Sequence, residues 1–320
     1  MSLMTGNLEN STTVTEFLLL GFGNLGDLDF LLFLLFLLIY IVTMVGNILI
    51  VALVVSDHSL HTPMYFFLGN LSCLEICYSS NIVPKMLTGF LHQGTTITVA
   101  GCKTQFYFFS LLAGTECYLL AVMSYDRYVA ICKPLLYAAL MDVKVCFQLA
   151  AGSWLSSLLI INLTMYLMRQ LTFCGPNAID HFFCDYSPLL KLSCSDTRVI
   201  ELITTLLAAL CSLPPFILTL ASYICIILAI LRISSTTGRQ KAFSTCSSHL
   251  IVVSIFYGTI MIVYLLPRTD TLRSWNKIFS LFYIVLTPLF NPLIYSLRNK
   301  EVKNALRKAL LKFCSYRIVV

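Results

Sequence analysis

Long apolar runs separated by short polar stretches recur along the whole chain. A helix that crosses a bilayer needs about 20 mostly apolar residues, and each run reaches or exceeds about this length. The pattern therefore predicts seven membrane-spanning helices. The second is the weakest by hydropathy, because polar residues such as Glu75 and Asn81 interrupt it. The expected spans cover residues 30–55, 63–83, 101–131, 145–166, 199–231, 242–265 and 277–295.

Composition excludes a soluble globular protein. Hydrophobic residues make up 58% of the 320 residues and charged residues 11%, whereas soluble domains contain about 45–50% and about 25%. The length leaves room for seven spans and short connections. We therefore predict an all-α membrane protein, a seven-helix bundle. Its expected parts are an extracellular tail (1–26), a transmembrane domain (27–298) and a cytoplasmic amphipathic helix and tail (299–320).

The distribution of basic residues orients this bundle. Cytoplasmic loops retain Lys and Arg, and 13 of the 21 basic residues fall on the inner side if the N-terminus is outside. After residue 299, Val302, Leu306 and Leu310 recur at helical spacing among Lys and Arg, which predicts a short helix on the inner leaflet. Contact with anionic membrane lipid explains the formal charge of +6, so we expect no nucleic-acid partner.

Four cysteines fall on the predicted outer side. Cys102 opens the third span, and Cys174, Cys184 and Cys194 lie in the long loop before the fifth. An oxidising compartment allows two disulfides there, and four cysteines permit three pairings. Asn10 begins an Asn-Ser-Thr motif in the exported tail, which makes it a candidate glycosylation site.

Three polar side chains lie deep within the predicted spans: Asn47, Glu75 and Glu116. Intramembrane carboxylates are costly, usually face the bundle interior and are functional candidates. They are compatible with a cation site, a proton-sensitive switch, or protonated groups bonded to Asn47 and Asn291 as structural glue. We favour the last of these roles, structural hydrogen bonding that depends on the conformational state. The sequence contains no HExxH or CxxC motif and its histidines are scattered, so we expect no metal, no cofactor and no enzymatic activity.

Two motifs mark the inner ends of spans. Asp126, Arg127 and Tyr128 end the third span, where Arg127 can latch onto Asp126 or simply extend to the membrane interface. Residues 291–295 end the seventh span, and Pro292 there removes one helical hydrogen bond and permits a kink. We interpret the second motif as a hinge.

Four strings resemble signatures of the olfactory receptor family, within the rhodopsin-like (class A) G-protein-coupled receptors. They are PMYFFL (63–68), MSYDRYVAIC (123–132), KAFSTCSSHL (241–250) and NPLIYSLRN (291–299). The resemblance covers nearly the whole chain and implies that Cys102 pairs with Cys184 and Cys174 with Cys194. Glu75 departs from the wider superfamily, which usually has Asp there, so a sodium site copied from those relatives is not expected.

The resemblance also implies a mechanism. An odorant would enter among the outer halves of the helices, and the receptor would activate a heterotrimeric G protein of the stimulatory, olfactory type and raise cAMP. Arg127 would leave Asp126 and join Tyr223 and Tyr295, while Lys241 would face the G protein. The implied location is the plasma membrane of olfactory sensory neuron cilia, with the N-terminus extracellular and the C-terminus cytoplasmic.

Helical spacing nominates one face of the third span as a pocket wall, with room for a guest beside the small residues Ala113 and Gly114. Tight helix packing is the competing explanation for those two residues. The nominated side chains are apolar or neutral, which predicts a small, uncharged, volatile ligand. From the third span they are Phe109, Ser110, Ala113, Gly114 and Cys117; by analogy with the family, Leu207, Cys211, Tyr257, Ile260, Tyr264, Leu281 and Ile284 complete the walls.

Other classes of membrane protein fit less well. A rhodopsin-like receptor for an amine would be expected to carry a carboxylate near position 109, where Phe109 stands. A non-olfactory receptor for another small lipophilic ligand is the nearest alternative. A transporter would show paired broken helices in repeated halves, and the sequence shows no such symmetry.

Overall fold

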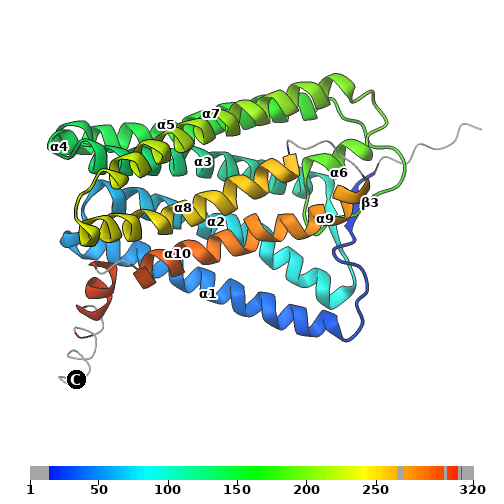
Figure 1. The fold of residues 1–320 in the computed structure, drawn as a ribbon. Helices are drawn as coiled ribbons and strands as arrows, with labels where there is room; N and C mark the ends of the chain where they lie inside the picture. The colour runs from blue at the N-terminus through cyan, green and yellow to red at the C-terminus, as the bar shows by residue number, and fades with distance from the viewer. Residues whose placement is uncertain (1–13, 265–269, 299–300, 309–310, 312–320) are drawn as a thin grey trace, which may run out of the picture.

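Seven long helical segments run side by side through the computed structural model (Figure 1). It describes residues 14–264, 270–298, 301–308 and 311, without the side chains of 241–242, 244–245, 248, 270–274 and 295–298. The first six segments are α1 (Leu28–Ser56), α2 (Pro63–His92), α3 (Val99–Cys132), α5 (Val143–Met168), α7 (Arg198–Leu231) and α8 (Thr236–Tyr264). The seventh joins α9 (Asp270–Leu281), the π-helical segment η3 (Phe282–Leu286) and α10 (Thr287–Arg298).

Short elements connect these segments. On the outer side lie three strands, β1 (Glu16–Leu19), β2 (Thr95–Thr98) and β3 (Ala178–Ile179), and the helix α6 (Tyr186–Lys191). The 3-10 turns η1 (His58–Leu60) and η2 (Pro134–Leu136) and the helix α4 (Tyr137–Leu140) lie on the inner side. Residues 301–308 are also helical, and Val302 and Ala305 are buried.

The predicted seven-helix membrane bundle is confirmed. Five helical segments among the described residues are long and apolar enough to cross a membrane; α2 is not among them, and the part of α8 from His249 to Tyr264 is a shorter apolar helix. Polar residues that lower the hydropathy of α2, such as Glu75 and Ser72, are buried inside the bundle. α2 also continues to His92, past its expected end at residue 83, because a proline such as Pro84 need not end a helix that neighbouring helices hold.

α3 is the central helix. Its most apolar stretch is 67% buried, against 11% for α1, and it packs on α2, α5 and α7. Thr98 caps its start by accepting a hydrogen bond from the amide of Gly101 at 3.0 Å. Several leucines of α1, such as Leu31 and Leu38, are instead largely exposed, as expected for side chains that face lipid.

The outer end carries a small sheet that the sequence analysis missed. β1 lies between β2, its antiparallel partner, and β3, its parallel partner. Phe17 and Leu19 of β1 are buried. Part of the tail predicted over residues 1–26 is therefore a structural element, whereas Asn10 lies outside the described residues.

Two disulfides fasten the long outer loop. Cys102 in the first turn of α3 is bonded to Cys184, with the Cα atoms 5.4 Å apart, and Cys174 is bonded to Cys194, with the Cα atoms 6.0 Å apart. This is the pairing that the family resemblance implies.

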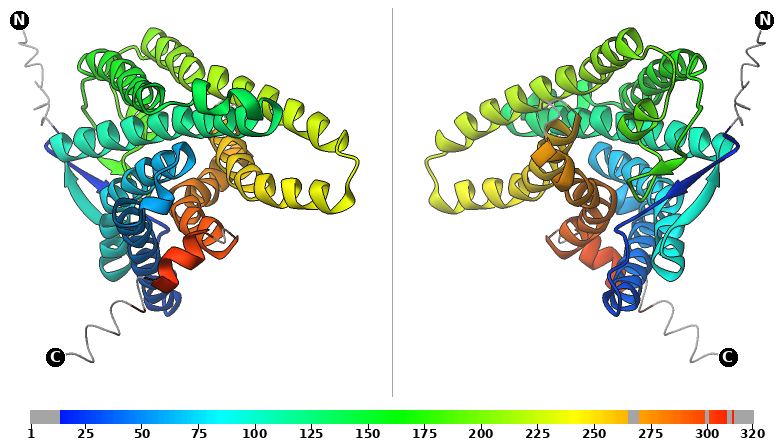
Figure 2. Two further views of the ribbon diagram at one scale, coloured as in Figure 1. Left: turned by 90° about the vertical axis from the view of Figure 1, so that its left-hand side faces the viewer. Right: turned by 90° about the vertical axis from the view of Figure 1, so that its right-hand side faces the viewer.

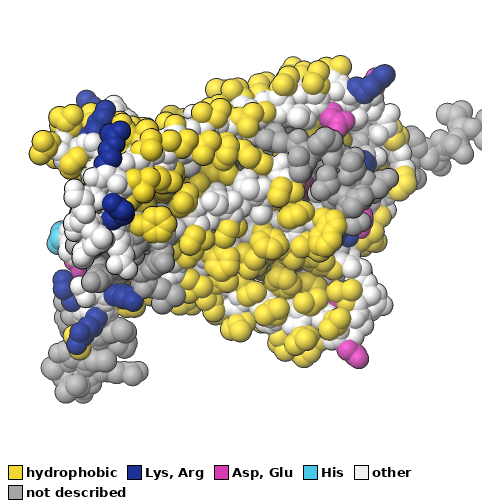
Figure 3. Space-filling view, in the orientation of Figure 1, with side chains coloured by type: hydrophobic (Ala, Val, Ile, Leu, Met, Phe, Trp, Pro, Cys, Tyr) yellow, Lys and Arg dark blue, Asp and Glu magenta, His cyan; other side chains and the backbone are white. Residues whose placement is uncertain are grey.

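Charge marks the two ends of the bundle. In Figure 3 an apolar belt covers the middle of the molecule, and Lys and Arg gather at the end where α8 begins and α10 ends. Figure 2 shows α7 and α8 leaning out from the bundle toward the loop that joins them at this end. The basic end is the cytoplasmic one by the positive-inside rule.

We predict that Cys102→Ser strongly lowers the amount of protein at the cell surface. Loss of a native disulfide commonly costs about 2–5 kcal/mol, and this one fixes the long outer loop onto α3. Surface labelling of an N-terminal tag measures the effect, and mass spectrometry of unreduced peptides checks the pairing. A free Cys184 in the unmodified protein would contradict the prediction.

Candidate functional site

A cavity of about 140 Å³ lies in the outer half of the bundle, among α3, α5, α7 and α8, beneath the long outer loop. An engineered protein cavity of about 150 Å³ holds benzene, so this one has the size of a small organic molecule. The nominated residues that line it are Phe109, Ser110, Ala113, Gly114, Cys117, Cys211, Ile260 and Tyr264.

Four nominated residues are not part of the described lining of this cavity. Tyr257 is buried between α3 and α8, where its hydroxyl donates to the backbone oxygen of Cys117 at 2.7 Å. Leu281 and Ile284 do not line the cavity, whereas Tyr283 does. The π-helical turns of η3 change the helix face on which each residue of this segment lies. Leu207 is half-buried beside the lining residues Thr204 and Ala208 of the same helix.

The analogy missed the wall supplied by α5. Ser157, Ile160, Ile161 and Thr164 recur at helical spacing and line the cavity together. That spacing in the fourth span was a usable sequence signal. The other lining residues that were not foreseen are Phe106, Asp185, Tyr186, Thr204, Ala208, Ser212 and Tyr283.

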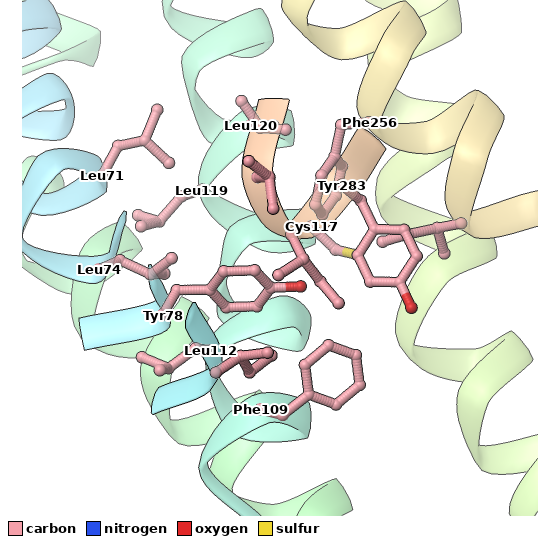
Figure 4. Close-up of a cluster of buried hydrophobic side chains, with 14 of the residues drawn as sticks. Leu71, Leu74, Tyr78, Phe109, Leu112, Cys117, Leu119, Leu120, Phe256 and Tyr283 are labelled. Atoms are coloured by element: carbon pink, nitrogen blue, oxygen red, sulfur yellow. The ribbon is translucent and has the colours of Figure 1, made fainter. Parts of the chain in front are cut away.

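A cluster of buried aromatic side chains packs beside the cavity, and Phe109 and Tyr283 belong to both the cluster and the lining (Figure 4). The rings of Tyr78 and Phe109 lie 5.7 Å apart between centroids, and those of Phe109 and Tyr283 lie 6.1 Å apart. In the same view Phe256 lies near Cys117, and Leu112 lies beside Phe109. One side of the cavity is therefore backed by a packed core.

One carboxylate lines the cavity, so the expected absence of charge is corrected. Asp185 directly follows the disulfide-bonded Cys184 and accepts a hydrogen bond from the Tyr264 hydroxyl at 3.1 Å. Helical periodicity carries no information on a loop that a disulfide folds inward, which is why the residue was not foreseen.

A second outer cluster ties the loop to the N-terminal segment. Lys277 forms an ion pair with Asp180 at 2.6 Å and donates to the backbone oxygen of Gly21 at 2.8 Å. His181 is buried next to this pair, and burial together with the positive charge of Lys277 lowers the pKa of His181 to about 3.

Deeper in the bundle, the predicted intramembrane polar residues fall into one region. Asn291 donates to the carboxyl group of Glu75, and both Glu75 and Glu116 are fully buried. Asn47 donates to the backbone oxygens of Thr43 at 3.0 Å and Pro288 at 3.1 Å. These hydrogen bonds join α1 and α2 to the seventh segment. Among the described residues, no group of three or more His, Cys, Asp or Glu is placed to hold a metal ion.

At the inner end of α3, Arg127 is paired with Asp126. The Nη2 atom of Arg127 lies 2.5 Å and its Nε atom 3.0 Å from the Asp126 carboxylate, which also accepts from the Tyr137 hydroxyl at 2.8 Å. Burial and the neighbouring Asp126 carboxylate raise the pKa of Tyr137. Tyr128 lies beside this pair, with Lys133 placed 5.8 Å from the centre of its ring.

The other predicted switch residues lie on α7, α8 and α10. Tyr223 is hydrogen-bonded to His249 at 2.5 Å rather than to Arg127. Pro292 lies inside α10 and packs closely against Gly46 of α1. The backbone of Lys241 and Tyr295 is helical, and their side chains lie outside the described part of the structure. His249 was not singled out, although it belongs to the KAFSTCSSHL string.

The helical bundle, outer cavity and inner latch define a membrane receptor, and comparison with known proteins gives its family. The family model for olfactory receptors matches residues 36–313. The chain is 51% identical to human olfactory receptor 10A7 over 94% of this chain and 96% of that protein. It is 51% identical to human olfactory receptor 11A1 over 96% of both, and 50% identical to human olfactory receptor 6B1 over 96% and 97%.

The chain belongs to the olfactory receptor family of class A G-protein-coupled receptors. Like the other members of this family, it is a multi-pass plasma-membrane receptor. It is not an enzyme.

We predict that Gly114→Ala destabilises the receptor by about 1–3 kcal/mol, the usual cost of overpacking. A Cβ atom at this position would overlap Ser157 Oγ, which donates to the Leu111 backbone oxygen at 2.7 Å, and would lie 3.0 Å from Cys211 Sγ. Thermal unfolding of the purified receptor measures the loss. Adding Ser157→Ala should recover part of it.

Gly152→Ala is the matched control, because a Cβ atom on Gly152 meets nothing within 4 Å. It should leave stability equal or slightly higher, since Ala favours helix over Gly. Equal effects of the two substitutions would contradict close packing at Gly114.

We predict that Glu116→Gln reaches the cell surface and changes basal signalling more than surface level, whereas Glu116→Ala loses surface level. Gln keeps the size and polarity of this fully buried side chain, whereas Ala opens a cavity in the packed interior at a cost of about 2–5 kcal/mol. Flow cytometry and a reporter of basal signalling provide the measurements. Equal loss with both variants would show that the cluster requires charge at Glu116 rather than a hydrogen bond.

Proposed function

We propose that the cavity binds a small, mainly apolar, volatile odorant and that binding activates a G protein of the stimulatory, olfactory type, which raises cAMP. The relatives at about 50% identity are named olfactory receptors. A cavity of about 140 Å³ with mainly apolar walls suits a guest of this kind. We place the receptor in the cilia of olfactory sensory neurons on the same grounds.

α8 is the element that supports this mechanism best, because it touches both the cavity and the latch. Ile260 and Tyr264 line the cavity at its outer end. At its inner end, His249 bonds Tyr223, and Cys246 packs with Tyr223 and Tyr128. A guest that shifts the outer end of α8 therefore acts on the contacts around Arg127.

Activation in this scheme exchanges one set of contacts for another. In the described state Arg127 is held by Asp126, and Tyr223 is held by His249. Release of both would free Arg127 to join Tyr223 and Tyr295, with Lys241 and the α7–α8 loop facing the G protein. A ligand drives this exchange only by binding the second state more tightly than the first.

We predict that cells expressing the receptor raise cAMP in a concentration-dependent manner toward members of a broad panel of uncharged, volatile molecules. Arg127→Ala should abolish this response at comparable surface level, because it removes the partner that the switch requires. A cAMP reporter with surface labelling provides the measurement. An agonist response that persists in Arg127→Ala, or in cells without the receptor, would refute the proposed coupling.

A further inference from the structure

The N-terminal segment of residues 16–23 lies at the outer end of the bundle, and its attachment to the long outer loop is short. Its strand β1 pairs with β2 over four residues but with β3 of that loop over only two. The amides of Leu18, Leu20 and Gly21 donate to backbone oxygens of the loop at 2.8, 2.9 and 3.1 Å. A parallel pair of this length has little stability of its own, so a further contact at its end matters.

Lys277 of α9 supplies this contact. Its Nζ atom donates to the Gly21 backbone oxygen at 2.8 Å, shortly after β1, and forms an ion pair with Asp180 at 2.6 Å, directly after β3. An ammonium group has three donors and no acceptor, so it can bind a carbonyl and a carboxylate at once. One side chain therefore bridges both strands and attaches them to the seventh helical segment. Lys277, Gly21 and Asp180 are called the clasp.

Next to the clasp, Phe22 is stacked between a helix and the loop. Its ring centroid lies 5.7 Å from that of Phe90 on α2 and 5.3 Å from that of Phe182. The ring centroids of Phe182 and Phe183 lie 5.3 Å apart, and those of Phe183 and the lining residue Phe109 lie 4.9 Å apart. A continuous row of ring contacts thus leads from the N-terminal segment to the cavity wall.

The seventh segment provides a second route from the clasp to the cavity. Lys277 lies about two helical turns before Tyr283, which lines the cavity. Between them, Ser280 Oγ accepts a hydrogen bond from the Tyr283 hydroxyl at 3.1 Å. None of residues 14–27 belongs to the described cavity lining. The N-terminal segment can therefore act on a guest only through the loop and the seventh segment.

The clasp lies at the surface, and this limits what it can do. The side chain of Lys277 is 21% exposed and that of Asp180 is 57% exposed. Exposed ion pairs add little to the stability of a protein, and the bond between Cys102 and Cys184 already fastens the loop. The clasp is thus not needed for folding. It is strong enough to shift the equilibrium between a fastened and an open N-terminal segment several-fold.

We propose that Lys277 is a positioning residue for the odorant cavity, because it clasps residues 16–23 to the outer loop and to the seventh segment. With the clasp closed, the loop and Tyr283 are held in the arrangement that surrounds a guest. With the clasp open, both gain freedom to move and the guest dissociates more easily. The inference rests on the proposed function, since it concerns the same cavity.

The first test needs no odorant. Hydrogen exchange of the purified full-length receptor, read by mass spectrometry, measures the opening of residues 16–23. Lys277→Met keeps the apolar stem of the side chain and removes its charge. We expect this peptide to exchange about two- to tenfold faster in Lys277→Met, the range for loss of a partly exposed ion pair and hydrogen bond. Lys277→Arg keeps the charge and should exchange like the unmodified receptor.

A double-mutant cycle shows whether Lys277 and Asp180 act together. Asp180→Asn should speed exchange less than Lys277→Met, because the bond to Gly21 remains. Adding Asp180→Asn to Lys277→Met should change exchange little further, as expected for two members of one contact.

Arg198→Met is the matched control. Arg198 forms an ion pair with Asp196 at 2.8 Å at the end of the same outer loop. The two residues are neighbours along the chain, so this pair attaches no second segment. Arg198→Met should leave the exchange of residues 16–23 unchanged.

The second test measures cAMP signalling at equal surface level. The probes are hexanol, hexanal, anisole and benzaldehyde, together with the strongest agonist of the broad panel. We expect Lys277→Met to raise the concentration for a half-maximal response about two- to tenfold, with basal signalling and maximal response unchanged. Lys277→Arg and Arg198→Met should respond like the unmodified receptor.

Each part of the inference can fail separately. Unchanged exchange in Lys277→Met, or additive effects of Lys277→Met and Asp180→Asn, would overturn the clasp. Faster exchange with unchanged agonist potency, or with raised basal signalling, would overturn the positioning role. If the unmodified receptor reaches the surface and responds to no probe and no panel member, the proposed function and the positioning role both fail, whereas the exchange result still decides whether the clasp exists.

Discussion

The bond between Cys102 and Cys184 is the constraint on which the outer half of the receptor depends. It holds the long loop against the first turn of α3, the central helix of the bundle. The chain on one side of this bond supplies β3, which pairs with β1, and the chain on the other side supplies Asp185 and Tyr186 to the cavity. A loop of this length without the bond would have many conformations to lose on ordering. The disulfide therefore determines both the cover of the cavity and its one described charge.

Beneath that cover, the bundle connects two regions that interact with different partners. The outer region is a mainly apolar cavity, and the inner region is the ion pair of Asp126 and Arg127 with Tyr137 beside it. Between them lies the polar contact of Glu75 with Asn291. Because the interior between them is tightly packed, whole helices rather than loose side chains would pass on a small displacement at the cavity. Coupling between the outer cavity and the inner ion pair would thus depend on how α8 and the seventh segment pack against α3.

Sequence periodicity predicted the fold well and the site only in part. Apolar runs of membrane length identify the spans because lipid requires every backbone polar group to be bonded within a helix. The same rule says nothing of which side chains meet across the bundle. Residues on α3 such as Phe109 and Cys117 were found by helical spacing alone, and those on α5 such as Ser157 obey the same rule and were overlooked. Tyr283 could not be placed, because a π-helical turn shifts the helix face without a clear sequence mark.

Polar and small residues make the specific contacts between the helices of this receptor. The reason is that the surrounding solvent is lipid. Lipid chains are as apolar as leucine, so the exposed leucines of α1 gain little by packing on another helix. Close approach requires small residues, as where Gly46 meets Pro292 and Gly114 meets Ser157. Direction and specificity require hydrogen bonds, because an unsatisfied polar group in a dry interior is costly. The same reasoning applies to a guest: apolar walls admit many small molecules, and the few polar groups among them favour guests with matching hydrogen-bonding groups.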